Sequence, residues 1–299
     1  MIIEPVSQLG LARHLMITIK DKNNNKEKRF ETPNVIIYGN LVDNGIPGDI
    51  ISFATSYKTH EGALIRFPRA DYIPYEEKIV KEGNVALVIG APKESLKDVD
   101  IVFTIISKDV GSSYRRTLDT IIKIRRVMRD DAILYVSGYF KPGSLPILYY
   151  FGVDLVDDAF LVGDPKRNVI ARNMVKVAEK VRKLIDEKRL RDYIEIIARK
   201  SQYNASMIKI GEKDYFKELE RGYPVLNEKK VLMTVFEEAL YRPDVRRYIE
   251  RLREYYVPPR SERVLLLIPC SYRKPYSKSK THREILKALS KIKNRYAIH

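Results

Sequence analysis

The sequence predicts an α/β protein, and three observations carry this prediction. Short apolar runs rich in Val and Ile recur through the first two thirds of the 299-residue chain, and Gly, Pro or Asp bounds most of them. Amphipathic helical patterns separate several of these runs, which is the signature of βαβ units. Continuous apolar runs such as Val85–Ile89 are typical of strands buried on both faces of a parallel sheet.

Strands and helices are expected to alternate in this region. Arg115–Met128 carries Leu118, Ile121 and Ile122 on one side and predicts an amphipathic helix between two strands. A longer helix is expected after Asp164, which would be its N-cap, with Pro165 in the first turn. The strand candidates are Leu15–Ile19, Val35–Tyr38, Val85–Ile89, Ile101–Ile106, Ala132–Val136 and Leu155–Val162.

Beyond Asp186 the pattern becomes mainly helical as far as Arg253. Two prolines in Val257–Ser261 force extended backbone and predict a linker. A buried strand is expected at Val264–Ile268, followed by a turn-rich segment and a basic helix over Thr281–Lys293. Within the helical part, one helix is expected from Asn227 through Leu240 and another from Pro243 through Tyr256. We therefore divide the chain into an α/β domain (residues 1–190), a helical segment (191–257) and a small C-terminal α/β domain (258–299).

Positive charge is concentrated near the C-terminus. The chain has 55 Lys and Arg against 39 Asp and Glu, a net charge of +16, and residues 241–299 alone hold 16 basic and 5 acidic residues. Tyrosines interleave the basic side chains, so phosphate neutralisation and base stacking are both available. This asymmetry predicts a nucleic-acid partner, although a solvated helix face remains the plain alternative. The RNA-binding candidates are Arg273, Lys278, Lys280 and Lys287.

Other function classes are excluded by composition. No apolar run approaches the ~18 residues of a membrane span, and the N-terminus lacks the pattern of a signal peptide. The single cysteine excludes an internal disulfide and a Cys-rich zinc site, and a reducing cytoplasm is the expected compartment. No glycine-rich nucleotide-binding loop is present, so we expect no cofactor and no metal.

One segment, Pro269–His282, contains the candidate catalytic residues. It places the single cysteine, Cys270, just beyond the expected last strand, where α/β folds bind ligands. The cationic neighbours Arg273 and Lys274 would lower the pKa of the thiol, and His282 is a candidate for proton transfer. The alternative is structural, because a lone cysteine is often a small buried hydrophobe and a lone histidine often only packs. A metal site is disfavoured, since one Cys and one His are too few ligands.

The same segment resembles a known family. The matching positions follow the pattern P-C-x3-K-P-Y-x2-S-x2-H that marks the archaeosine synthases: Pro269, Cys270, Lys274, Pro275, Tyr276, Ser279 and His282. Two segments that precede this motif are also similar to sequences of that family: Leu190–Arg199 and Arg242–Val245. Gly152–Asp158 looks like the Gly-Val-Asp segment of the parent family, the tRNA-guanine transglycosylases. The resemblance implies a reduced barrel of the transglycosylase type over residues 1–190.

The departures from the parent family are informative. Transglycosylases hold a zinc ion with three Cys and one His, and the single cysteine here means that this site is absent. Their Asp-Ser-Gly-Gly motif has no match. Asp157 falls at the position of their nucleophile, so the resemblance implies that it either holds the modified base or is a relic, without base exchange.

The resemblance also implies a reaction. Archaeosine synthases act on tRNA that carries the nitrile-bearing base preQ0 in the D-arm, with free lysine as the amine donor. Cys270 would add to the nitrile as a thioimidate, His282 would shuttle protons and Lys274 would stabilise the thiolate. Tyr276 and Ser279 would orient the base.

A second polypeptide is the remaining expectation. The chain ends seventeen residues after His282, whereas the family usually continues into a PUA-type RNA-binding domain. We expect a second subunit that carries the remaining domains, and a radical SAM enzyme is a candidate partner. Two other functions stay open: a non-catalytic tRNA-binding subunit, and an unrelated α/β enzyme for a small anionic substrate.

Overall fold

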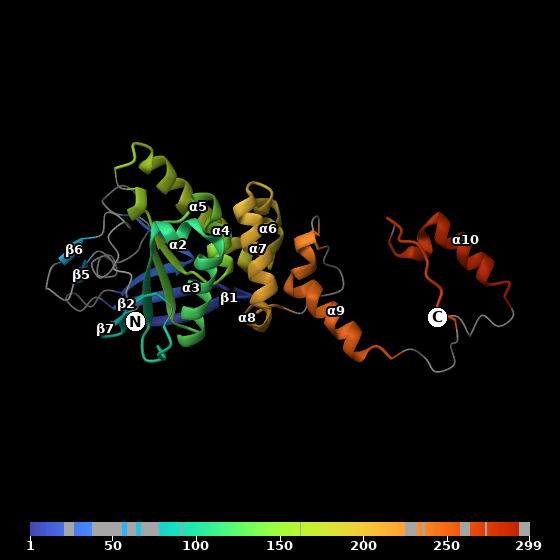
Figure 1. The fold of residues 1–299 in the computed structure, drawn as a ribbon, viewed down its shortest axis with the longest axis horizontal. Coiled ribbons are helices and arrows are strands. Elements are labelled where there is room, and N and C mark those ends of the chain that lie inside the picture. The colour runs from blue at the N-terminus through green and yellow to red at the C-terminus, as the bar shows by residue number, and fades with distance from the viewer. Residues whose placement is uncertain are drawn as a thin grey trace. The chain divides into compact units, whose positions relative to one another are not determined.

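The structure is a computed structural model that describes residues 1–20, 27–37, 56–58, 64–66, 78–90, 92–161, 163–224, 232–234, 237–257, 264–272 and 274–292. The chain divides into two compact units, Met1–Arg247 and Tyr248–His299. Within these ranges no helix is long and apolar enough to cross a membrane. Figure 1 labels the helices of both units and some of the strands.

A six-stranded sheet forms the centre of the first unit, in the order β4-β11-β10-β9-β8-β7. All neighbouring pairs are parallel except β7 with β8. The α/β class is therefore confirmed. Among the described strands the sheet is open, with β4 and β7 at its edges. Its strands are β4 (Asn34–Ile36), β7 (Lys78–Glu82), β8 (Val85–Ile89), β9 (Ile101–Ile106), β10 (Ile133–Gly138) and β11 (Leu155–Asp157).

Helices cover one face of this sheet. Alternate strand residues such as Val102, Leu134 and Val156 join Leu118 and Met174 from the helices in the larger apolar core. The predicted helix over Arg115–Met128 is confirmed as α3 (Tyr114–Val127), and its buried residues form one stripe. The helices of the first unit are α2 (Lys108–Ser112), α3, α4 (Leu145–Tyr150), α5 (Arg167–Asp186), α6 (Leu190–Ala198), α7 (Gln202–Asp214) and α8 (Phe216–Arg221).

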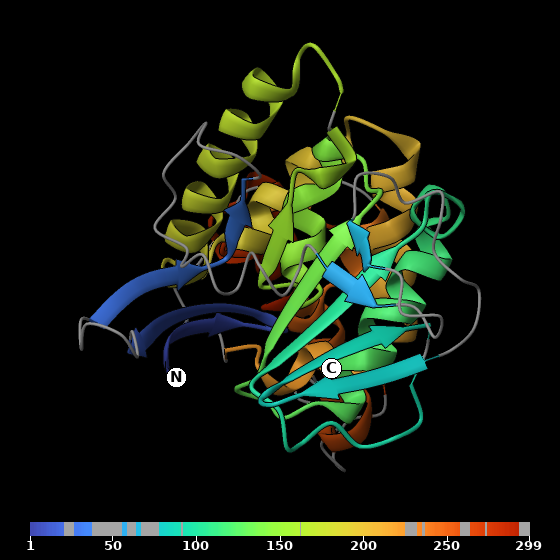
Figure 2. The ribbon, with the colours of Figure 1, turned by 90° about the vertical axis from the view of Figure 1, so that its left-hand side faces the viewer.

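The other face packs against a small antiparallel sheet. Phe103, Tyr135 and Leu155 lie with Ile17 and Phe30 in a second core, to which none of the described helices contributes. The small sheet has the order β1-β2-β3 and is visible beside the large one in Figure 2. Its strands are β1 (Ile2–Leu9), β2 (Ala12–Lys20) and β3 (Glu27–Thr32); a separate pair consists of β5 (Ser56–Lys58) and β6 (Leu64–Arg66).

Two helix predictions differ from the structure. Helix α5 begins at Arg167 with Lys166 at the N-cap, while the Asp164 carboxylate accepts a hydrogen bond from the Lys166 N–H at 2.7 Å. Asp164 thus closes a turn before the helix instead of capping it. The expected helix from Asn227 through Leu240 is wrong over its described part, because residues 232–234 are not helical and Glu237–Tyr241 is a 3-10 turn.

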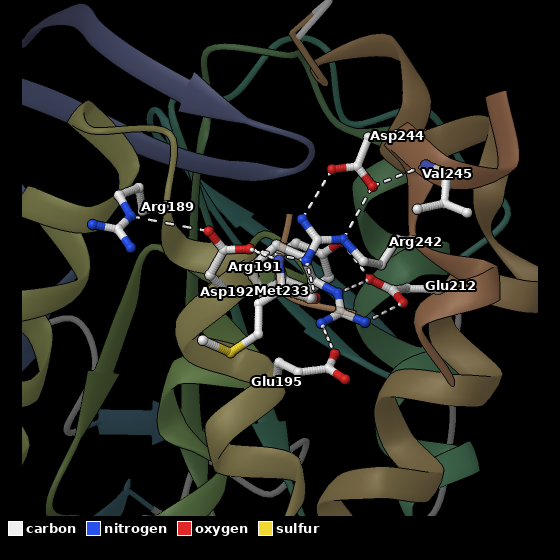
Figure 3. A network of polar contacts seen from close by, with 10 residues as sticks. Arg189, Arg191, Asp192, Glu195, Glu212, Met233, Arg242, Asp244 and Val245 are labelled. Atoms are coloured by element: carbon white, nitrogen blue, oxygen red, sulfur yellow. Dashed lines mark hydrogen bonds and ion pairs between the residues drawn. The ribbon is translucent and has the colours of Figure 1, made fainter. Parts of the chain in front are cut away.

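A buried polar network joins the helices of the segment 191–257 to one another (Figure 3). The Arg191 guanidinium on α6 donates to Glu195 and to both carboxylate oxygens of Glu212 on α7. Next to it, Arg242 donates to Asp192 and Asp244. Buried charges of both signs therefore satisfy one another where the helices meet.

The second unit corrects a further prediction. Val264–Ile268 is not a buried strand: Leu265 is 69% and Leu267 is 84% exposed. An apolar run becomes a strand only where another strand supplies its hydrogen bonds, and no described strand pairs with this run. Helix α9 (Pro243–Tyr255) matches the predicted helix and crosses the division between the units, and α10 (Lys280–Leu289) matches the predicted basic helix.

Candidate active site

The motif segment forms a compact turn before α10. A 3-10 turn over Tyr276–Lys278 leads directly into the helix. Ser279 is the N-cap, and its hydroxyl oxygen accepts a hydrogen bond from the His282 backbone N–H at 3.2 Å. A serine at this position satisfies an N–H that the helix itself leaves unpaired. The cap therefore sets where the His282 side chain emerges.

Cys270 lies exposed beside two polar groups of this turn. The Tyr276 hydroxyl is 3.3 Å from its sulfur, and the Lys274 ammonium is 3.8 Å from the same atom. The hydrogen bond with Tyr276, followed by the positive charge of Lys274, lowers the pKa of the Cys270 thiol below its ordinary value. Both groups stabilise a thiolate, which is the nucleophilic form of cysteine.

Tyr276 connects the cysteine to the histidine. The Lys274 ammonium lies 3.6 Å from the centre of the Tyr276 ring, and the His282 ring stacks on that ring with centroids 4.6 Å apart. His282 Nδ1 is 2.8 Å from the Ser279 hydroxyl. One chain of contacts thus runs from Cys270 through Tyr276 to His282 and Ser279.

His282 is buried, with a side chain that faces Tyr276 and Ser279. In the described part of the chain no hydrogen bond joins it to Cys270, and its Nε2 has no hydrogen-bond partner. The Ser279 hydroxyl contacts both the His282 backbone N–H and the ring atom Nδ1. Proton transfer by His282 stays a prediction.

The expected position of Cys270 just beyond a strand was wrong, because Val264–Ile268 forms no strand. The cysteine is exposed, so it is not the small buried hydrophobe of the structural alternative. Sequence spacing also did not reveal that Lys274 and Tyr276 contact the sulfur, since loop residues four and six positions away have no fixed direction.

The RNA-binding candidates are solvent-facing where the structure describes them. Lys278, Lys280 and Lys287 are exposed around the turn and on α10. Arg273 lies outside the described residues. The exposed cations lie within the same compact unit as Cys270.

Asp157 is in the other unit and fully buried at the end of β11. Its carboxylate accepts a hydrogen bond from the Tyr135 hydroxyl at 2.8 Å and one from the Ala159 N–H at 3.0 Å. Burial raises the pKa of Asp157 to about 6, against hydrogen bonds from Ser137 and Tyr135 that lower it. A carboxyl group at the carboxyl edge of a parallel sheet is where the fold places ligand-binding groups.

The chain is similar in sequence to one domain family and to several archaeal proteins. A family described as "Domain of unknown function (DUF5591)" matches residues 245–298. The archaeosine synthase subunit alpha of Methanosarcina acetivorans is 25% identical over 302 residues, which covers 79% of this chain and 47% of that protein. The subunit alpha of Thermoplasma acidophilum is 29% identical over 180 residues, covering 54% and 34%. The archaeosine synthase of Methanocaldococcus jannaschii is 29% identical over 219 residues, covering 66% and 36%.

The chain is a homologue of the archaeosine synthases. It spans about a third to a half of the length of the curated relatives it matches. The predicted resemblance to the archaeosine synthases is thereby confirmed. The roles of the motif residues and of Asp157 remain predictions.

The two candidate sites differ in whether the matched domain family covers them. The DUF5591 match contains the whole segment from Cys270 to His282, so the contacts around the thiol belong to a region shared beyond this chain. Asp157 lies outside that match and inside the part of the chain that the resemblance assigns to the transglycosylase-like domain. The chain therefore has an exposed thiol in one unit and a buried carboxyl in the other.

Proposed function

We propose that this chain takes part in archaeosine formation by adding an amine to the nitrile of preQ0 in tRNA, with lysine as the donor. The observation that carries the proposal is the Cys270 sulfur, exposed and flanked by the Tyr276 hydroxyl and the Lys274 ammonium. A nitrile carbon is electrophilic, and a stabilised thiolate is a suitable nucleophile for it.

The proposed reaction has two steps. The Cys270 thiolate forms a bond to the nitrile carbon, and the nitrile nitrogen takes up a proton to give a thioimidate. The lysine amine then attacks the same carbon and loses a proton, and the carbon–sulfur bond breaks to release the thiolate. The product is an amidine that contains every atom of the nitrile and the amine, and no cofactor is consumed.

Two side chains are placed to serve these steps. The Tyr276 hydroxyl already contacts the sulfur, so it can donate a hydrogen bond near the nitrile as negative charge develops on nitrogen. Lys274 supports the thiolate before attack and after its release. The His282 ring stacks on the Tyr276 ring, and the Ser279 hydroxyl contacts His282 Nδ1.

Recognition of the substrate is proposed to involve a second polypeptide. Relatives from Thermoplasma acidophilum and Methanosarcina acetivorans are named as alpha subunits, which supports a second subunit for this chain. Phosphate contacts from Lys278, Lys280 and Lys287 would add affinity but little choice among bases. A radical SAM enzyme would then act on the lysine adduct.

The first unit supports the finer fold proposal, a reduced barrel of the transglycosylase type. Strand β4, the first of the large sheet along the chain, pairs in parallel with β11, the last, as the first and last strands do in a closed (β/α) barrel. The helices pack on one face, and Asp157 ends β11 on the same face as Leu155, in the second core. We propose that Asp157 contacts the modified base.

The test is incubation with preQ0-containing tRNA and lysine, followed by nucleoside mass spectrometry. The wild-type chain, with its partner subunit, is expected to yield the lysine adduct, and Cys270→Ser is expected to yield none while binding tRNA equally well. Ser277→Ala, a change at an exposed position in the same turn, is the control and keeps activity. Unchanged product formation by Cys270→Ser would leave the non-catalytic tRNA-binding subunit as the better interpretation.

A further inference from the structure

A basic cleft of about 950 Å³ opens in the first unit, away from Asp157. It lies between the last turn of α3, helix α8, the β1–β2 turn and the loop that precedes β10. That loop leads into the amino end of β10, whereas Asp157 is at the carboxyl end of β11, and the two strands are parallel. The cleft and the buried carboxyl are therefore at opposite edges of the sheet.

The floor of the cleft holds more positive than negative charge. The guanidinium groups of Arg13 and Arg125 both pair with the single carboxylate of Asp154. Their side chains are 7% and 8% exposed, and Asp154 is fully buried. Two buried cations thus share one buried anion, and burial together with the charge of Arg13 lowers the pKa of Arg125 to about 10.

A polar atom on this floor is left without a partner. Arg13 Nε is buried and makes no hydrogen bond with any described residue, although Arg13 lines the cleft. A buried N–H without an acceptor is costly, so the Arg13 guanidinium keeps unused hydrogen-bonding capacity in the floor.

The rim adds further cations. Lys97, Lys217 and Arg221 line the cleft and are exposed, and none of the three forms an ion pair with a described residue. By contrast, Arg126 pairs with Glu218, and Arg129 pairs with Asp100 and Asp131. The lining contains seven basic and three acidic residues. Two further carboxylates, Asp154 and Asp100, pair with lining arginines without lining the cleft themselves. When these two are also subtracted, the cleft keeps a net charge of two positive charges.

We propose that this cleft binds the phosphodiester backbone of RNA, with the rim cations and the Arg13–Arg125 floor each taking phosphate oxygens. An open cleft lined by exposed cations over buried guanidinium groups suits a chain of anions, because each phosphate meets a separate donor. The inference rests on the proposed function, since that function brings tRNA to this chain. It adds a second contact surface in the unit that does not contain Cys270.

The experiment uses two pairs of neutralising substitutions in the full chain. Lys217→Gln/Arg221→Gln removes two cations one helical turn apart on α8. Arg172→Gln/Lys176→Gln removes two exposed cations with the same spacing on α5, outside the cleft. Fluorescence anisotropy with a labelled, unmodified tRNA transcript then gives the affinity as a function of salt, and circular dichroism verifies that each variant is folded.

The expected result is a change in the slope of log K against log salt. Loss of two phosphate contacts lowers the magnitude of that slope by about 1.4 to 1.8 for the α8 pair, and the α5 pair leaves it unchanged. Lys97→Gln, on a different element, is expected to lower it by about 0.7 to 0.9. Inorganic phosphate at constant ionic strength is expected to compete only weakly.

Several results would overturn the inference. Equal slopes for wild type and the α8 pair would mean that RNA binds outside this cleft, and the proposed function would be unaffected. Equal losses for both pairs would mean that only overall charge matters, and strong competition by inorganic phosphate would assign the cleft to a small anion. Absence of any tRNA binding by the wild-type chain with its partner subunit would reject the proposed function together with the cleft.

Discussion

Arg191 offers the sharpest test of the energetics that hold helices α6 and α7 together. Its side chain is 1% exposed and donates to Glu212 at 2.5 and 2.9 Å and to Glu195 at 2.6 Å (Figure 3). Tyr150 donates a further hydrogen bond to Glu212 at 2.7 Å. The substitution Arg191→Met keeps much of the side-chain length and removes the entire charged group.

The cost follows from what the substitution leaves behind. Two carboxylates, each 2% exposed or less, lose three charge-assisted hydrogen bonds and their counter-ion. Breaking a buried pair by removing one partner costs about 3 to 5 kcal/mol. At about 2 to 4 °C per kcal/mol for a unit of this size, the expected fall in Tm is roughly 6 to 20 °C.

Arg189→Met is the matched control. Arg189 is two residues away, 61% exposed, and 4.0 Å from Asp192, so its loss is expected to cost less than about 1 kcal/mol. Urea unfolding followed by circular dichroism measures both variants, with an unchanged m-value as the sign that only stability has moved. Arg191→Met/Glu212→Gln should recover part of the loss, because it removes one of the unpaired charges. A cost for Arg191→Met no larger than for Arg189→Met would refute this reasoning.

Three further predictions concern other parts of the molecule. Tyr276→Phe removes the hydrogen bond that most lowers the pKa of Cys270, so the pH at which iodoacetamide alkylation reaches half its maximum rate should move upward; an unchanged profile would contradict that contact. For Asp157, burial raises the folded-state pKa from 3.8 to about 6. The folded protein therefore binds the proton more tightly, and the stability of wild type relative to Asp157→Asn should fall by roughly 2 to 2.5 kcal/mol as pH rises from 4 to 7. Unfolding curves across this range measure that difference, and a constant difference would argue against the shift. Gly211→Ala would place a methyl group 2.1 Å from the Phe151 ring, and the resulting overpacking should cost about 1 to 3 kcal/mol in the same assay, whereas Gly143→Ala, with open space around its Cβ, should cost less.

Several elements of the first unit could be predicted from local pattern alone. Val85–Ile89 and Ile101–Ile106 are strands with the predicted bounds, and α3 differs by one residue at each end. In these segments the spacing of the apolar residues matches the period of the strand or helix that they form. Burial of the apolar side chains and local secondary structure therefore favour the same conformation. The family resemblance was likewise contained in seven positions of one loop.

Other features depended on partners far away in the chain. Val264–Ile268 is as apolar as the buried strands, yet it is exposed because no described strand pairs with it. The pKa of the Asp157 carboxyl is raised only because tertiary packing buries the group, and this burial outweighs the hydrogen bonds from Ser137 and Tyr135 that lower the pKa.

The sequence by itself determined the α/β class, the main strands and helices of the first unit, and the segment that holds Cys270. Tertiary structure alone decided which side chains meet: Tyr276 with the Cys270 sulfur, and Arg13 with Arg125 on the carboxylate of Asp154. The physical reason is that periodicity encodes which side of an element is buried, whereas contacts between distant residues depend on how the elements pack.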